Sequence, residues 1–495
     1  MNLDYRSVPY RIFENVSRIA GIVIVSVVFS TGDGSQGGTE STGLEPLVLG
    51  GFILFGLVAV ALWEMTYVKR YEYRITPDTF EIYSGVFSRR EREIPFKRIQ
   101  NIDVAQNVFQ RALGIAEVRL ETAGGGESEA VLQYVSRAEA TRLQELVSDR
   151  KHGESQRDTE VPDNTLFELD SNELAVLGLT SANFNLLGLI LVMFAVLGTP
   201  VAAEQVSPRL SVLLLLGPAL AALALVLLWI VSGIQAILRY YGFRLVRHEG
   251  ELRYQRGLLQ QYNGTIPLSK IQTVMIRENF IARAVGYGNL AIETAGYAPG
   301  QDGNSVESAI PIAKRDRLFD LARTVESVGE VEFTRPPKRA RLRYVGRYTI
   351  VVAVLVALLA GINTTTGTLN DWYLGALSWA LVPLAAHLKW THLGYYYDEG
   401  YVVTRSGFWT RQTTIVPYYR VQTVSETQTV FQRRRQLGTL VVDTASSGGF
   451  WGGNAVALDI DIDEARQLRE TVHNRFQWSL RERRTQRIRR FEAAD

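Results

Sequence analysis

Hydrophobic positions along this chain gather in three blocks, and each block is followed by a segment with a different periodicity. Each block holds two apolar runs near the roughly 20 residues that a helix needs to cross a membrane, such as Leu213–Val231. The pattern therefore predicts three transmembrane hairpins, with an interfacial helix as the alternative for the short first run. The expected helices are residues 12–30, 46–67, 174–202, 210–238, 345–363 and 372–390.

After each hairpin, large apolar and polar residues alternate with the period of a half-buried strand, as in residues 71–85. Each such segment closes with an amphipathic helix. The first of these helices is predicted to begin at Ser136, with Glu139 at the capping-box position and Leu143 on its apolar stripe. Strands followed by one helix favour a small antiparallel barrel or sandwich with a C-terminal helix.

A repeated phrase shows that the three segments are copies of one module. It reads IPFKRIQ from Ile94, IPLSKIQ from Ile266 and VPYYRVQ from Val416. In every copy a glycine stands ten residues before the proline and a Thr-Ala pair begins 22 residues after the glutamine. The fold class is thus an α-helical membrane protein with about six helices and three α+β modules.

The repeats and apolar blocks divide the chain into units. Transmembrane hairpins are expected in residues 1–70, 173–238 and 344–392, modules in 71–150, 239–330 and 393–475, linkers in 151–172 and 331–343, and a basic tail in 476–495.

The phrase, the hairpin before each module and the Thr-Ala-Gly strand end resemble the bacterial pleckstrin-homology-like (PH-like) domain of YdbS/YdbT-type membrane proteins. The resemblance covers nearly the whole chain. It implies a PH-like fold, a smaller single-module YdbS-type protein as partner, and a role in the cell envelope or in tolerance to membrane-active agents. Copy three departs most, because Ser446 replaces a glycine and its helix-ending glycine is expected at Gly438, two positions late. It is expected to bind a different ligand or none.

Nine residues of the phrase are candidates for a module surface or for a structural motif. They are Pro95, Arg98, Gln100, Pro267, Lys270, Gln272, Pro417, Arg420 and Gln422. A role in folding is favoured over direct binding, because proline suits the start or edge of a strand. Repetition alone does not separate the two, since duplicated binding sites would also repeat.

Charge indicates the orientation of the chain. The short loops between paired helices are nearly free of Lys and Arg, whereas the opposite flanks are basic, so both termini and all modules are expected in the cytosol. Asn363 then lies in an outward loop as a glycosylation acceptor that need not be used. The net charge of +2 does not indicate a nucleic-acid partner.

Two basic segments are candidates for contact with anionic lipid, with a solvated flank and a frayed end as the alternatives. The residues are Arg89, Arg90 and Arg92, and in the tail Arg483, Arg484 and Arg487.

The residue inventory limits the chemistry. There is no cysteine, and the five histidines lack metal-ligand spacing. No catalytic or nucleotide-binding motif is present, so we expect no enzyme activity and no cofactor. The expected function is a membrane scaffold whose modules bind a protein partner, supported by lipid. The alternative is transport or lipid movement through the bundle, where Asn183 and Asn185 would be the polar residues of interest.

Overall fold

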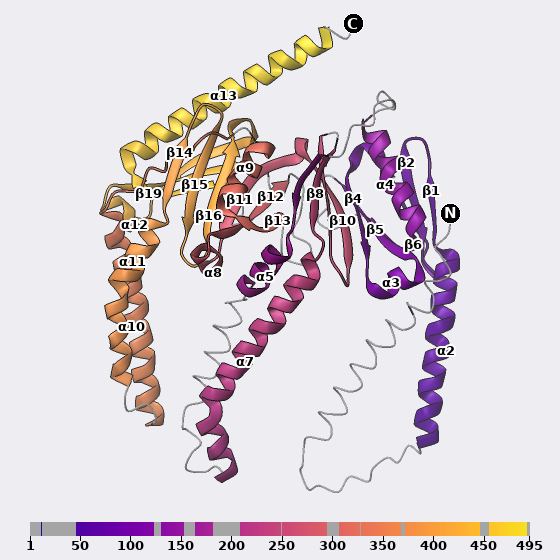
Figure 1. Ribbon diagram of the computed structural model, residues 1–495, viewed down its shortest axis with the longest axis horizontal. Helices are drawn as coiled ribbons and strands as arrows, with labels where there is room; N and C mark the ends of the chain where they lie inside the picture. The colour runs from indigo at the N-terminus through magenta and orange to yellow at the C-terminus, as the bar shows by residue number, and fades with distance from the viewer. Residues whose placement is uncertain are drawn as a thin grey trace. The chain divides into compact units, whose positions relative to one another are not determined.

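The computed structural model describes most of the modules and parts of the apolar blocks (Figure 1). The described residues are 11, 46–122, 130–152, 164–181, 208–248, 250–294, 306–326, 328–367, 372–445 and 455–492. They divide into two compact units. Unit 1 comprises Met1–Pro162 and Gln255–Thr265; unit 2 comprises Asp163–Tyr254 and Ile266–Asp495.

The first module has two antiparallel sheets and a closing helix, as the alternation predicts. Its elements are β1 (Glu72–Ile75), β2 (Thr79–Ser84), β3 (Arg90–Pro95), β4 (Ile99–Gln106), α3 (Val108–Leu113), β5 (Ile115–Thr122), β6 (Ala130–Ser136) and α4 (Arg137–His152). Strands β1–β3 form one sheet, and β4–β6 pair in sequence order. Phe80, Leu120 and Leu143 come from both sheets and the helix and share one buried core. The predicted cap is confirmed, since Ser136 Oγ accepts from the Glu139 backbone amide.

The other two modules repeat this order. Module 2 has β8 (Arg244–His248), β9 (Glu251–Arg256), β10 (Gln261–Pro267), β11 (Ile271–Glu278), α8 (Phe280–Ala284), β12 (Tyr287–Thr294), β13 (Val306–Lys314) and α9 (Arg315–Val325). Module 3 has β14 (Gly394–Tyr397), β15 (Tyr401–Gly407), β16 (Arg411–Pro417), β17 (Val421–Thr427), α12 (Val430–Arg433), β18 (Leu437–Thr444), β19 (Ala455–Asp461) and α13 (Ile462–Glu492).

Three long helices precede the modules: α2 (Pro46–Arg70), α7 (Pro208–Tyr240) and α10 (Ala340–Thr366). Two segments, Leu223–Tyr240 and Ala340–Thr365, are long and apolar enough to cross a membrane. Six spanning helices are therefore not shown. The expected first helix and most of the third, including Asn183 and Asn185, lie outside the described residues.

The prediction of one continuous helix at residues 372–390 was wrong. This segment is a 3₁₀ helix, η5 (Trp372–Leu381), followed by the ten-residue helix α11 (Val382–Thr391). Pro383 lies in the first turn of α11, where a residue without a backbone N–H is tolerated. In a continuous α-helix the backbone N–H of residue 383 would donate to the carbonyl four residues earlier, and proline has no such N–H. The change from 3₁₀ to α-helix occurs at this point.

The predicted linkers contain ordered structure. Residues Asn164–Glu168 form strand β7, which pairs with β8, and Phe167 is buried with its ring 6.1 Å from that of Phe243. In the second linker, Thr334 forms a β-bridge with Tyr395. Strand β7 is held by one buried aromatic residue, and the second linker pairs at one residue only. Neither segment is long enough to show a strand periodicity in the sequence.

Copy three requires a further correction. Gly114 and Gly286 end the short helices of modules 1 and 2 with φ of 70° and 77°, and the equivalent residue in module 3 is Gln436, with φ of 52°. Its carbonyl accepts from the amide of Ile462, at the start of the closing helix, as Gly114 and Gly286 do for their own helices. Gly438 instead packs closely against the side chains of Ala465 and Ile462.

Replacing Gln436 with glycine should therefore stabilise module 3. A side chain in the left-handed region costs roughly 1–2 kcal/mol, partly offset by the greater chain entropy of unfolded glycine, so we expect a gain of about 1 kcal/mol. Thermal unfolding in detergent measures it. The control Gln436→Ala keeps a Cβ at the same φ and should not gain; an equal gain in both variants would contradict the argument.

Candidate functional site

The repeated phrase forms the corner between the two sheets of each module. Its proline ends β3, β10 or β16, and one turn of 3₁₀ helix follows: η1 (Phe96–Arg98), η4 (Leu268–Lys270) or η6 (Tyr418–Arg420). The first amide of each turn donates to a backbone carbonyl of the preceding hairpin, at Asp78, Gly250 and Gly400 respectively. The structure thus places Pro95, Pro267 and Pro417 at one backbone corner.

The glutamine of the phrase stands at a β-bulge in every module. The registers of β4 with β5, β11 with β12 and β17 with β18 each shift across it, at Gln100, Gln272 and Gln422. Gln272 is buried whereas Gln422 is exposed. In module 2 this bulge lies beside the β11 edge, which β16 covers, whereas in module 3 it lies beside the β17 edge, which no described strand covers. The exposure of the glutamine therefore depends on whether the neighbouring edge is covered.

Modules 2 and 3 are joined by direct strand pairing. Strand β16 of module 3 pairs antiparallel with β11 of module 2, from Val274↔Ile415 to Glu278↔Arg411. The pairing buries Met275 and Ile276 completely. Beside it, Arg420 of the phrase donates to the carbonyl of Ser269, at 2.7 Å.

An ion pair marks the end of this interface. Glu278 accepts two hydrogen bonds of 2.7 Å from the Nε and Nη2 atoms of Arg411, and both side chains are largely buried. The equivalent residues, Gln106 and Gln428, donate to a carbonyl within their own modules. The carboxylate is therefore particular to module 2, and its bidentate partner comes from module 3.

Unit 1 contains a pairing of the same kind. Strand β4 pairs antiparallel with the part of β10 that belongs to this unit. The paired residues are Gln261 with Gln106, Tyr262 with Ala105, and Asn263 with Val104. The Tyr262 hydroxyl donates to the buried carboxylate of Asp103. After the first and the second phrase, the edge strand thus pairs with residues of the hairpin that precedes the next phrase.

Module 3 leaves the equivalent edge open. In the described part of the chain, β17 pairs with β18 alone. Its outer positions are polar and exposed, including Thr423, Ser425 and Thr427. At the opposite end of the series, β3 pairs only with β2 among the described strands, and its exposed residues alternate in charge from Arg90 to Glu93.

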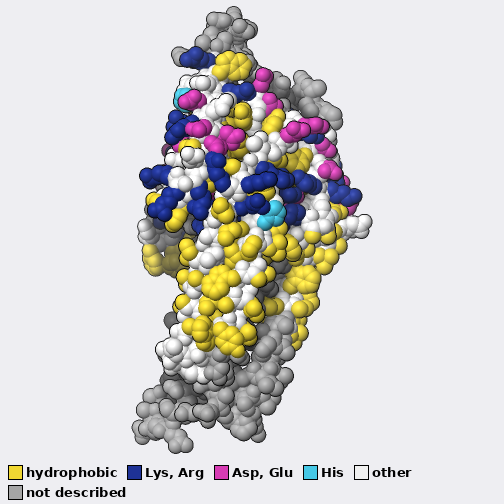
Figure 2. All heavy atoms as spheres, turned by 90° about the vertical axis from the view of Figure 1, so that its left-hand side faces the viewer, with side chains coloured by type: hydrophobic (Ala, Val, Ile, Leu, Met, Phe, Trp, Pro, Cys, Tyr) yellow, Lys and Arg dark blue, Asp and Glu magenta, His cyan; other side chains and the backbone are white. Residues whose placement is uncertain are grey.

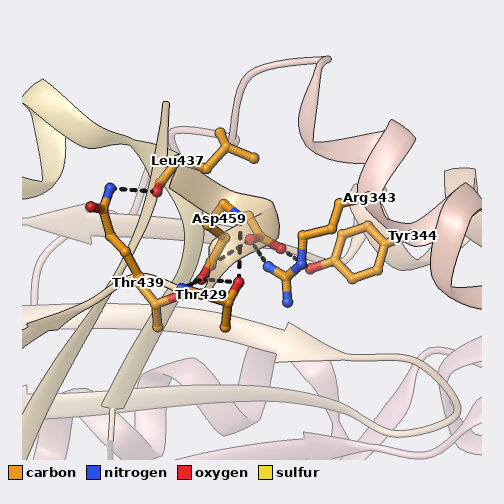
Figure 3. A network of polar contacts seen from close by, with 8 residues as sticks. Arg343, Tyr344, Thr429, Leu437, Thr439 and Asp459 are labelled. Atoms are coloured by element: carbon orange, nitrogen blue, oxygen red, sulfur yellow. Dashed lines mark hydrogen bonds and ion pairs between the residues drawn. The ribbon is translucent and has the colours of Figure 1, made fainter. Parts of the chain in front are cut away.

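A buried polar network fixes module 3 to helix α10 (Figure 3). Asp459 of β19 is fully buried and has a left-handed backbone, with φ of 58°. Its carboxylate accepts from Arg343 and Tyr344 of α10, and from Gln432 Nε2 of α12 at 2.7 Å. Because a buried carboxylate is costly unless it is paired, the network favours one position of the module on its helix. Nothing in the sequence pattern singled out Asp459.

The predicted lipid-contact residues lie in two places. Arg90 and Arg92 are exposed on β3, and the Arg89 guanidinium lies 5.4 Å from the Tyr83 ring centre. Arg483, Arg484 and Arg487 fall within α13, but their side chains lie outside the described residues. Arg98 is exposed and Lys270 is half-buried on the 3₁₀ corners.

Comparison with known proteins identifies the class. The family model described as "Bacterial PH domain" matches residues 22–151, 185–328 and 341–476, and the chain belongs to this family. It is similar to the UPF0699 transmembrane protein YdbT of Bacillus subtilis (strain 168), at 27% identity over 424 residues that cover 80% of this chain and 84% of the relative. No solved structure matches significantly.

Asp459→Asn should destabilise module 3, because it keeps the shape of the side chain but removes the charge that pairs with Arg343. Breaking a buried ion pair from one side costs about 3 kcal/mol or more. Thermal unfolding in detergent should show a clear fall in Tm. The matched control is Asp463→Asn, whose ion pair with Arg466 is exposed, and it should change stability by less than about 0.5 kcal/mol. Equal effects would argue against the network.

Proposed function

We propose that this protein is a membrane-anchored scaffold whose β17 edge accepts a strand from the PH-like module of a separate partner protein. The observation that carries the proposal is the equivalence of β17 to β11, which receives β16 along the same edge. Strand addition supplies backbone hydrogen bonds along the edge, and the side chains on each face give specificity. The partner would repeat between two chains a contact that this chain makes within itself.

The composition of β17 favours a reversible contact. Met275 and Ile276 of the covered edge correspond to Ser425 and Glu426 of the open one. A polar edge stays soluble without its partner, because unpaired edges with apolar side chains invite aggregation. Less apolar burial on pairing means a weaker complex than the junction between modules 2 and 3.

Charge argues against a second copy of this chain as the partner. In the register of β11 with β16, the β3 strand of another copy would place Glu91 opposite Glu426, and like charges directly opposite are destabilising. Arg469 of α13, 3.7 Å from the Glu426 carboxylate, reduces this repulsion. Arg92 would face Ser425. A smaller single-module YdbS-type protein is the partner that the family resemblance suggests, with a role in the cell envelope.

The membrane position is part of the proposal. Support comes from the two helices apolar enough to span, from the word transmembrane in the name of the relative, and from the basic last turns of α2 and α7, with Lys69, Arg70 and Arg239. Basic flanks remain in the cytosol, so the modules would face it. The six-helix arrangement remains a prediction.

Cross-linking from Ser425 tests the partner edge. The chain has no cysteine, so Ser425→Cys carries a photoreactive maleimide at one defined position. In native membranes we expect a cross-link to another PH-like protein. The cross-linked peptide of that protein should be the strand directly before its Ile-Pro phrase. The matched control is Asp463→Cys, also exposed, which lies at the start of α13 directly after β19, the strand at the opposite edge of the same sheet. Cross-linking to residues 90–95 of this chain would instead identify a second copy, and adducts without a PH-like strand would reject the edge.

The same control variant tests the orientation. If the modules are cytosolic, a membrane-impermeant maleimide should label Asp463→Cys only after the cells are permeabilised. Labelling of intact cells to the level seen after permeabilisation would place the modules outside.

A further inference from the structure

One end of the sheet shared by modules 2 and 3 collects cationic side chains. The strand registers align Glu278 with Arg411, and Arg411 with Gly407. Arg405 lies two residues before Gly407 and therefore projects from the same face of the sheet. His392 lies two residues before β14, whose first residue pairs with Arg405, so the histidine falls at this end as well.

Further cations surround this group, and one carboxylate is present. Arg283 of α8 and Arg315 of α9 come from module 2, and Lys389 comes from the last turn of α11. Glu278 accepts two bonds from Arg411 and lies 3.8 Å from Arg315. Its charge also acts on Arg283 and Arg405, so several cations share this one carboxylate among the described residues at this sheet end.

Several nitrogen atoms of this cluster are buried without hydrogen bonds. They are Nη1 of Arg283, Nε of Arg405 and Nδ1 of His392. The Arg405 guanidinium also lies 4.0 Å from the centre of the Phe333 ring, which fixes its plane. Buried polar atoms are nearly always hydrogen-bonded, so three such atoms in one cluster lack the acceptors that an anion would supply.

The electrostatics agree with the geometry. Burial, together with the positive charges of Arg283, Arg411, Arg405 and Lys389, lowers the pKa of His392 to about 4. Burial and the neighbouring arginines likewise lower the pKa of Arg405 to about 10. The imidazole is therefore neutral at pH 7 and offers hydrogen bonding, whereas the arginines carry the charge. An anion here would relieve repulsion between these cations.

The cluster lies at the end of the modules next to helices α10 and α11. His392 directly follows the last residue of α11, and the Phe408 ring is 6.1 Å from Tyr348 of α10. Exposed Trp409 and Phe280 have ring centres 6.3 Å apart beside the cluster. On the face shown in Figure 2, Lys and Arg side chains form a band next to the apolar surface of the helices. Aromatic and cationic side chains at this level suit a lipid headgroup layer.

We propose that Arg283, Arg405 and His392 form a phosphate-binding site between modules 2 and 3, occupied by the headgroup of an anionic phospholipid. The guanidinium groups supply charge-assisted hydrogen bonds to phosphate oxygens, and Trp409 and Phe280 lie against the lipid surface. The inference rests on the proposed membrane anchoring but not on the β17 edge, so the two can fail separately.

Lipid binding by the full chain tests the site. The chain is placed in nanodiscs of phosphatidylcholine alone, or with one part in five of phosphatidylglycerol, and the lipids retained on extraction into mild detergent are quantified by mass spectrometry. We expect retained phosphatidylglycerol to fall about tenfold in the double variant Arg283→Gln/Arg405→Gln, the loss expected for roughly one charge-assisted bond. The matched control, Arg323→Gln/Arg466→Gln, removes two charges from exposed helix positions and should retain the lipid.

Stability measurements separate a lost site from a lost fold. Without lipid, the double variant should melt at the wild-type temperature or higher, because it removes mutually repelling cations. Phosphatidylglycerol should raise the Tm of wild type but not of the double variant. Inorganic phosphate in detergent is the second arm: if it raises the wild-type Tm as much as the lipid does, the ligand is a free phosphate. Equal lipid retention by wild type and double variant, or a double variant that melts lower without lipid, would overturn the proposal.

Discussion

An unpaired sheet edge must be covered, protected or used, and this constraint organises the described modules. The edge strand β11 receives β16 of the following module, and in unit 1 the edge of β4 receives residues Gln261–Asn263. Backbone pairing of this kind depends little on side-chain identity. Residues at the contact can therefore diverge, as the Glu278–Arg411 pair and the polar β17 edge illustrate, while the pairing itself repeats.

The buried network at Asp459 adds a second constraint. It draws together α10, α12 and β19 (Figure 3). A carboxylate without exposure to solvent depends on all its donors at once, so the position of module 3 on α10 is not easily varied. A force or a charge acting on the start of α10 would therefore be transmitted to the sheet that carries the open edge.

Features that depend on neighbouring residues could be predicted from the sequence. The three copies, the strand–helix order and the Ser136 cap follow from periodicity, capping and repeat spacing. Pairing between modules joins residues more than a hundred positions apart, and no local pattern encodes it. Gln436 was missed because a polar residue replaces glycine at a left-handed position, and the break before α11 was missed because hydropathy does not distinguish 3₁₀ from α-helix. Asp459 looked like one acid among several, since its burial depends on α10.

The late arrival of β16 has a consequence for synthesis. Arg411 is made 133 residues after Glu278, a delay on the order of ten seconds at bacterial translation rates. During that interval the apolar edge formed by Val274, Met275 and Ile276 has no strand to cover it. The ribosome is meanwhile producing the third apolar block. The length of the segment between β11 and β16 thus sets how long an aggregation-prone strand edge stays uncovered during synthesis.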